Sequence, residues 1–234
     1  MSGSVVADEV ARFDALAAEW WDPRGPMAPL HAMNPLRTRW ADRQIRTALG
    51  GPARLLDVGC GAGLVAEAMA KLGHDVLGLD AAANVVDVAA AHAEGQNLSL
   101  SYRVGSTETL IAEGQSFQAI TALEVIEHVA DPAEFVAMLA ELLEPGGVLV
   151  MSTLNRTRRS YLTAKLGAEY LLRMLPVGTH DWQKFVPPEE LARHMRAAGL
   201  RTVAQAGMSY NPLRATWFES RNLSVNYLAA ARRD

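Results

Sequence analysis

Three side chains that can accept a proton or bind a metal ion follow one apolar run of the sequence. The run Phe117–Leu123 ends directly before Glu124, Glu127 and His128, which are spaced i, i+3 and i+4. In a helical turn this spacing places side chains on one face. Two carboxylates and one imidazole would suit Mg²⁺, Mn²⁺ or Zn²⁺, whereas His128 alone would suit a general base, because its ordinary pKa is near neutrality. The alternative is that these residues have only a structural role. Acidic side chains stabilise the start of a helix, and a histidine there can hydrogen-bond to the backbone.

A second group of chemically informative residues lies in the sequence LLDVGCGAG, Leu55–Gly63. An apolar run that contains Asp57 leads into glycines that alternate with small residues, beginning with Gly59 and Gly61. The pattern predicts a strand, a tight turn and a helix, with bare backbone against which a flat ligand can lie. A dinucleotide site would need a third glycine where Leu64 stands, which disfavours a nicotinamide cofactor. The spacing resembles motif I of class I S-adenosylmethionine-dependent methyltransferases, which implies an acid near the cationic methionine end of the cofactor.

The next apolar run, HDVLGLD, ends in Asp80, 21 positions after Gly59. An acid at about 20 positions from the glycine turn lies at the tip of the neighbouring strand and can accept hydrogen bonds from both ribose hydroxyls of a nucleoside. An ionised carboxylate accepts two such bonds better than a neutral one. We therefore expect Asp80 to bind the cofactor ribose, the alternative being a solvated acid at a strand end.

These residues require a parallel sheet that brings the ends of several strands to one edge. Residues 1–50 are expected to form an N-terminal helical arm, and residues 51–234 a Rossmann-like α/β domain in which strands and helices alternate. Ligands of such sheets bind beyond the carboxyl ends of the strands. Seven strands are expected, with the last two forming an antiparallel edge hairpin: Arg54–Val58, Asp75–Leu79, Leu98–Val104, Phe117–Leu123, Gly147–Thr153, Arg201–Gly207 and Val225–Arg232. Predicted helices include Asn34–Leu49, with Pro35 near its first turn, Leu64–Leu72, Asn84–Ala93 and Pro132–Leu143.

The composition excludes several classes of protein. The chain of 234 residues is half hydrophobic and carries a net charge of −4, which gives no general case for binding nucleic acid. A single cysteine, Cys60, excludes an internal disulfide framework, and it is read as a packing residue of the glycine turn. There is no signal-peptide pattern and no apolar run of about 18 residues, so we expect a cytoplasmic protein that is at most peripheral to a membrane.

Residues 155–185 are an amphipathic basic insertion after the fifth predicted strand. Six cationic and two acidic side chains give this segment a charge of +4, and apolar residues are interleaved with them. Such a segment can lie on an anionic membrane surface or form a lid over an active site. The remaining alternative is a helix packed on the core with a solvated basic face.

Several short stretches together resemble one narrower family, the ubiquinone biosynthesis O-methyltransferases. The resemblance runs from about residue 9 to residue 231. The stretches that carry it are FDALA at 13–17, EWWD at 19–22, PLHAMNPLR at 29–37, STLNR at 152–156, GAEY at 167–170, GTHDW at 178–182 and YNP at 210–212.

The resemblance implies methyl transfer from S-adenosyl-L-methionine to phenolic hydroxyls of polyprenylated intermediates, at both O-methylation steps of ubiquinone biosynthesis. Carried over residue by residue, it places Arg37 over the cofactor carboxylate and Leu123 at the adenine. It also places Gly59 in motif I and Asp80 at the ribose. The family's E-x-x-E-H pattern implies divalent-ion ligands, Mg or Zn, at Glu124, Glu127 and His128.

Two alternatives to this function stay open at the level of the sequence. One is an S-adenosylmethionine-dependent O-methyltransferase of another small phenolic substrate. The other is a non-catalytic member of a biosynthetic complex at the membrane surface, which the intact Asp57, Gly59, Asp80 and His128 argue against.

Overall fold

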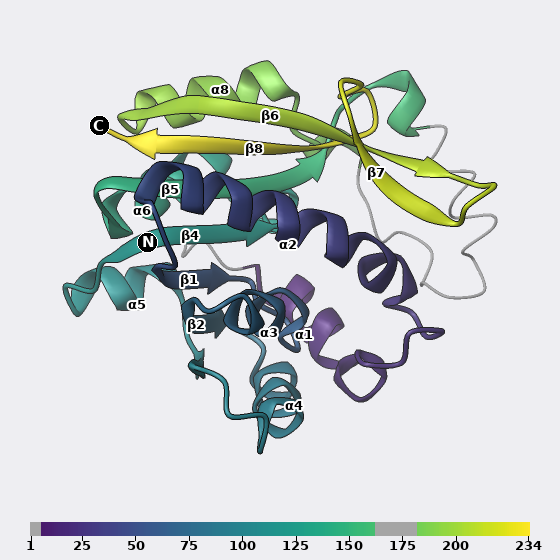
Figure 1. Ribbon diagram of the computed structural model, residues 1–234, viewed down its shortest axis with the longest axis vertical. Coiled ribbons are helices and arrows are strands. Elements are labelled where there is room, and N and C mark those ends of the chain that lie inside the picture. The colour runs from purple at the N-terminus through teal and green to yellow at the C-terminus, as the bar shows by residue number, and fades with distance from the viewer. Residues whose placement is uncertain (1–5, 162–181) are drawn as a thin grey trace.

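The computed structural model describes residues 6–161 and 182–234. Its centre is a sheet of eight strands in the order β3-β2-β1-β4-β5-β8-β6-β7 (Figure 1). The strands are β1 (Arg54–Val58), β2 (Asp75–Asp80), β3 (Leu100–Val104), β4 (Phe117–Leu123), β5 (Leu143–Leu154), β6 (Leu200–Asn211), β7 (Thr216–Ser220) and β8 (Asn226–Arg233).

The first five strands are all parallel, and the last three pair antiparallel. The parallel part places the carboxyl ends of β1, β2 and β4 at one edge of the sheet, where the predicted site residues follow each strand. Because β8 is antiparallel to both β5 and β6, β6 runs in the same direction as β5 and also ends at that edge. The Rossmann-like sheet that the alternating pattern predicts is confirmed.

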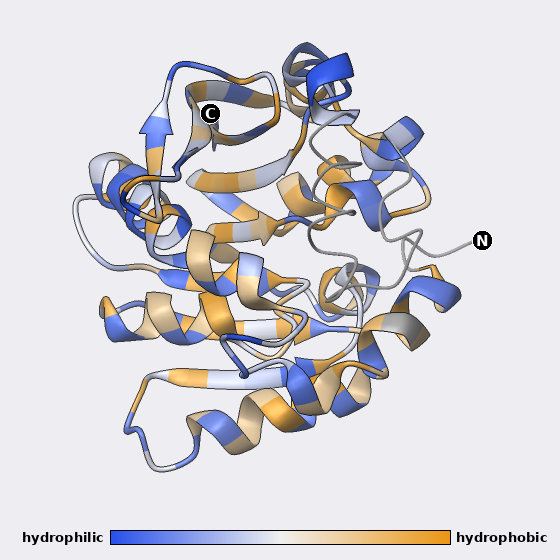
Figure 2. Ribbon diagram, turned by 90° about the vertical axis from the view of Figure 1, so that its right-hand side faces the viewer, coloured by the Kyte–Doolittle hydropathy of each residue, from blue (hydrophilic) through white to orange (hydrophobic). Residues whose placement is uncertain are grey.

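Helices cover both faces of this sheet, and each face buries its own apolar cluster. One cluster joins alternate strand residues such as Leu56 and Ile120 to α6 (Pro132–Leu142) and α8 (Pro188–Ala197). The other joins Leu55 and Ala119 to α2 (Ala28–Leu49) and α3 (Leu64–Lys71). Figure 2 shows the central strands coloured mainly as hydrophobic and the helices as mixed. Strands that are apolar on both faces are typical of a parallel sheet between two helical layers.

The beginning of the chain lies over the turn that follows β1. It contains α1 (Ala7–Asp14), η1 (Ala17–Glu19) and then α2, which Figure 1 shows crossing one face of the sheet. A third apolar cluster joins Ala17, Trp20 and Met27 to Ala62 in the glycine turn and to Val85 in α4 (Ala83–Ala93). The first part of the arm, residues 6–27, is thus packed against the predicted cofactor turn. The remaining short helices are α5 (Thr107–Ala112), η2 (Ile126–His128) and η3 (Trp182–Lys184).

Three expectations about the elements need correction. The sheet has one strand more than predicted, because β7 pairs with an extended β6. The last two predicted strands do pair antiparallel, but β8 lies inside the sheet between β5 and β6, and β7 forms the edge. The helix expected to begin at Asn34 begins at Ala28, so that Pro29 takes the first turn and Pro35 lies in the interior. Most of the predicted insertion, residues 162–181, lies outside the described residues.

Candidate functional site

The glycine turn is fastened to the end of the neighbouring strand by backbone and side-chain hydrogen bonds. The backbone N–H groups of Gly59 and Cys60 both donate to the carbonyl of Leu79, at 2.8 and 3.1 Å. The N–H of Gly61 donates to Oδ2 of Asp80 at 2.9 Å. The turn and the strand-end acid therefore form one rigid unit at the carboxyl edge, where the sequence predicts the cofactor to bind.

Asp80 is arranged as an acceptor at this edge. Its Oδ1 accepts from the N–H of Ala82 at 2.9 Å, while Oδ2 takes the bond from Gly61. Burial raises the pKa of Asp80, and the backbone N–H donors oppose that rise. A carboxylate has about four lone-pair positions, so both oxygens keep capacity for a further donor such as a ribose hydroxyl.

Asp57 lies at the end of β1 and is almost completely buried. The hydroxyl of Thr121 donates to its Oδ1 at 2.6 Å, whereas its Oδ2 has no partner of good hydrogen-bond geometry among the described residues. Burial raises the pKa of Asp57 to about 7, against the lowering effects of Thr121 and Arg37. A cationic group bound here would favour the ionised form, in keeping with the expected sulfonium end of the cofactor.

Arg37 projects from α2 toward the same place and is also buried. The side chain of Asn34 holds the guanidinium in place. Its Nδ2 donates to the backbone carbonyl of Leu64 at 2.6 Å, and its Oδ1 accepts from the guanidinium of Arg37 at 3.3 Å. The Nε atom of Arg37 is buried without a hydrogen-bond partner in the described chain. Burial lowers the pKa of the guanidinium, and Glu124 and Asp57 raise it. A buried, unmatched guanidinium donor suits a carboxylate ligand, so the residues fit the expected amino-acid end of the cofactor.

The three predicted metal ligands are not on one helical face, which is a correction to the sequence analysis. Glu124 adopts a positive φ of 59°, so the chain turns sharply there and η2 begins only at Ile126. Glu124 accepts from the hydroxyl of Ser152 at 2.7 Å, and Glu127 accepts from the hydroxyl of Thr153 at 2.9 Å. In the part of the chain that the structure describes, no group of three or more His, Cys, Asp or Glu side chains is arranged to hold a metal ion.

The two carboxyl groups nevertheless interact. Glu127 is 3% exposed, and burial, followed by the charge of Glu124, raises its pKa well above the usual range. Its Oε1 atom is buried and accepts no hydrogen bond from the described residues. Such a pair shares a proton or binds a cation, because two buried negative charges in contact are unfavourable. Binding of a divalent cation by Glu124 and Glu127 remains a prediction.

His128 is directed toward the N-terminal helix instead. Its Nδ1 atom lies 3.2 Å from Oε2 of Glu9, and Lys184 lies 3.7 Å from the other oxygen of Glu9. The ring of Phe13 meets the imidazole edge-on, with centroids 5.3 Å apart. His128 is mostly buried beside the carboxyl edge, where a proton acceptor for a hydroxyl substrate is expected.

Leu123 ends β4 and is packed in the apolar cluster below α2. The residue is 7% exposed at the end of the strand. The adenine contact remains a prediction.

Sequence reasoning missed the side chains that lie against the glycines. A Cβ atom at Gly61 would lie 2.4 Å from the ring of Trp20, and one at Gly59 would lie 2.6 Å from Cγ2 of Val125. Both glycines have positive φ angles, of 53° and 66°. Trp20 belongs to the EWWD stretch that carries the resemblance, but only the fold reveals that it covers the turn.

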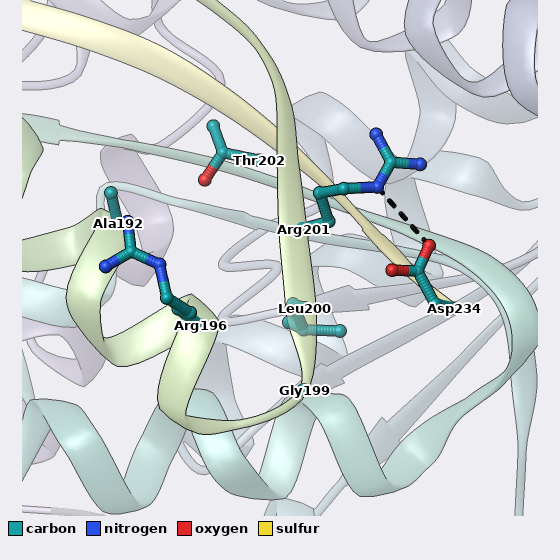
Figure 3. Close-up of a pocket in the computed structure, with 7 residues that line it drawn as sticks. All are labelled: Ala192, Arg196, Gly199, Leu200, Arg201, Thr202 and Asp234. Atoms are coloured by element: carbon teal, nitrogen blue, oxygen red, sulfur yellow. Dashed lines mark ion pairs between the residues drawn. The ribbon is translucent and has the colours of Figure 1, made fainter.

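A separate pocket of about 390 Å³ lies between the end of α8, the start of β6 and the end of β8 (Figure 3). Arg201 and Asp234 form an ion pair in it, at 3.4 Å. Because β6 begins at the edge opposite to the carboxyl ends, this pocket contains none of the predicted site residues.

Comparison with known proteins agrees with this geometry. A family model described as a methyltransferase domain matches residues 31–205. A ubiquinone biosynthesis O-methyltransferase from Dinoroseobacter shibae is 46% identical over 240 residues, covering 98% of this chain and 97% of the relative. Proteins of the same name from Cereibacter sphaeroides and Caulobacter sp. are 48% and 44% identical, covering 96% and 100% of this chain and 95% and 96% of the relatives.

Solved structures with the same fold are more distant in sequence. A SAM-dependent methyltransferase from Thermotoga maritima superposes with a TM-score of 0.63 at 16% identity, over 96% of this chain and 99% of that one. Magnesium protoporphyrin IX methyltransferase from Synechocystis, solved with bound SAH, superposes with a TM-score of 0.59 at 16% identity. The match covers 84% of this chain and 83% of that one. These likenesses establish the fold, while the full-length relatives are specific to one family. The chain therefore belongs to the ubiquinone biosynthesis O-methyltransferases, and it is an S-adenosylmethionine-dependent methyltransferase.

Proposed function

We propose that the protein transfers the methyl group of S-adenosyl-L-methionine to a phenolic hydroxyl of polyprenylated intermediates, at both O-methylation steps of ubiquinone biosynthesis. The observation that carries the substrate class is the identity of 44–48% over nearly the full length to relatives with that name. The site supports the reaction with a cofactor turn and a histidine at one edge of the sheet.

The reaction is an in-line displacement in which the O–CH3 bond forms as the S–CH3 bond breaks, and S-adenosylhomocysteine leaves as a neutral thioether. Asp57, Arg37 and Asp80 would bind the cofactor's cationic, carboxylate and ribose groups and thereby fix the position of the methyl group. His128 accepts the hydroxyl proton as the oxygen attacks. Positioning supplies most of the rate enhancement in such a transfer, and proton removal adds about 10²- to 10⁴-fold.

A divalent cation is part of the proposal as a ligand of Glu124 and Glu127. The buried, unmatched Oε1 of Glu127 beside Glu124 supports it, since a cation would replace a shared proton there. When bound, the cation would supply positive charge that lowers the pKa of a nearby phenol. Ser152 and Thr153 would hold the two carboxylates in place through the hydroxyl bonds already present.

The function is tested by product mass after incubation with S-adenosylmethionine and a short-chain prenylated catechol. We expect a gain of one methyl group, loss of turnover on chelation, and its return with Mg²⁺ or Zn²⁺. A chelator already saturated with Mg²⁺ is the control. Turnover that survives chelation would remove the cation from the proposal and leave His128 as a metal-free base.

The same assay separates the alternatives. Equal turnover of water-soluble and prenylated catechols would indicate another small phenolic substrate. Cofactor binding without methylation of any phenol would contradict the proposal and support a non-catalytic role in a membrane-surface complex.

We also propose that the protein is cytoplasmic and binds peripherally to the inner membrane, where a polyprenylated substrate resides. No helix in the described residues is long and apolar enough to cross a membrane. Arg158 and Tyr161 are exposed at the start of the basic insertion, and Leu213 is 96% exposed at the turn between β6 and β7. The substrate must enter at this edge of the sheet. Exposed cationic and apolar groups there favour binding to an anionic lipid surface.

Cosedimentation with vesicles tests this association. We expect binding to rise with the fraction of anionic lipid and to weaken at high salt, because surface charge attraction is screened. Arg158→Glu is expected to weaken binding, whereas Arg196→Glu, in the pocket at the opposite edge, serves as the matched control. Binding that is indifferent to anionic lipid would count against the membrane proposal.

A further inference from the structure

We infer that Glu9, on the first helix of the arm, is a positioning residue that orients His128 for the transfer reaction. The inference rests on the proposed function, in which His128 accepts the substrate proton. It extends the site to a segment more than a hundred residues away in the sequence.

The contact between the two side chains is direct. Oε2 of Glu9 and Nδ1 of His128 are 3.2 Å apart, although their orientation does not meet hydrogen-bond geometry. Oε2 is buried and has no hydrogen-bond partner among the residues described, so the imidazole is the charged or polar group that it faces. A buried carboxylate oxygen is costly unless a polar partner compensates it.

A second residue of the same helix holds the other side of the ring. Phe13 follows Glu9 by four positions, so the two side chains lie on one face of α1. The Phe13 ring meets the imidazole at 88° with centroids 5.3 Å apart. One helix face therefore presents a carboxylate to Nδ1 and an aromatic ring to the imidazole, which together restrict its rotation.

Lys184 completes the arrangement from a different part of the chain. Its Nζ atom lies 3.7 Å from Oε1 of Glu9, while Oε2 faces His128. The lysine thus lies beside the oxygen that does not face the histidine. The carboxylate thus has a defined orientation, with one oxygen for each partner.

The chemical consequence concerns which imidazole nitrogen carries hydrogen. A carboxylate at Nδ1 favours the tautomer with hydrogen on Nδ1, which makes Nε2 the nitrogen that accepts a proton. A carboxylate in this position also fixes the direction in which Nε2 points. The same arm lies on the cofactor turn, because Trp20 packs against Gly61 and its ring is 6.1 Å from that of Phe13. Docking of the arm would therefore orient the base and cover the cofactor together.

The test uses the full chain and steady-state kinetics with the prenylated catechol. Glu9→Gln is expected to lower kcat by about 10- to 100-fold, the range known for loss of a partner that orients a metal-bound histidine. The KM for S-adenosylmethionine should stay within about 2-fold, because no cofactor ligand is changed. Glu9→Asp should recover part of kcat. Asp8→Asn, one position away and exposed, removes the same charge from α1 and should match the unmodified protein.

A double-mutant comparison distinguishes orientation of His128 from support of the fold. In a His128→Gln background, Glu9→Gln should cause no further loss of kcat, since the residue it orients is gone. An equal loss in both backgrounds, or a rise in the cofactor KM with kcat unchanged, would overturn the inference and assign Glu9 to docking of the arm. Methylation by the unmodified protein is measured alongside, so its absence would refute the proposed function rather than the role of Glu9.

Discussion

Replacing His128 with glutamine is expected to lower kcat for methylation of a prenylated catechol by about 10²- to 10⁴-fold, the contribution of a positioned general base. Glutamine can still hydrogen-bond, but it cannot take up the hydroxyl proton. The KM for the cofactor should change little, because the carboxylate of Asp80 is held by the N–H groups of Gly61 and Ala82, which the substitution leaves in place. Initial rates at saturating cofactor measure the effect.

His194→Gln is the matched control for this result. His194 lies on α8, where it is 4.0 Å from Glu190, and it is not among the residues predicted to bind the cofactor or substrate. Its replacement should leave kcat unchanged. A His128→Gln protein that folds, binds S-adenosylmethionine and keeps full activity would rule out the proposed base.

Replacing Asp80 with alanine is expected to weaken binding of S-adenosylmethionine by about 10²-fold, since hydrogen bonds to a charged group contribute about 1.5–3 kcal/mol. Two effects act in the same direction. The ribose hydroxyls lose their acceptor, and the N–H groups of Gly61 and Ala82 lose theirs, so the glycine turn keeps only its backbone bonds to Leu79 of β2. Calorimetric titration of the cofactor measures the change in Kd.

Asp75→Ala controls for the loss of an acid from the same strand. Asp75 begins β2 at the opposite edge of the sheet, where it accepts from the hydroxyl of Ser99. Its replacement should leave the cofactor Kd within about 2-fold, as expected for a surface site away from the ligand. If Asp80→Ala bound the cofactor as well as Asp75→Ala, the ribose role of Asp80 would be wrong.

The five parallel strands could all be predicted from the sequence, although β5 begins at Leu143 and not at the predicted Gly147. β1 and β4 have the predicted bounds, because strands buried on both faces are continuous apolar runs. The edge strand β7 was missed, since its side chains alternate between exposed and half-buried and its position depends on pairing with β6. The predicted start of α2 was wrong, because it placed Pro35 in the first turn of the helix. Packing of α2 on the sheet outweighs the local preference of proline for that position.

The site was predicted as a set of residues but not as an arrangement. Asp57, Gly59, Gly61 and Asp80 lie together because strand ends of a parallel sheet must meet, which a sequence reveals through spacing alone. The single helical turn assumed for Glu124, Glu127 and His128 is not formed, because Glu124 has a positive φ, which is not visible in its residue type. Glu9 could not be found in advance, since its partner lies far away in the sequence.

The position of β8 also determines the order in which the sheet can be completed. β8 follows β6 and β7 in the chain, yet it separates β5 from β6 and supplies the pairing for both. Until it inserts, β5 and β6 each present an unpaired row of backbone groups, which is a template for association with other chains. Joining the two halves requires contacts between residues as distant as Val148 and Arg232, and such non-local pairing forms slowly. Before β8 pairs, the sheet is therefore open between β5 and β6, and exposed strand edges of this kind favour aggregation during folding.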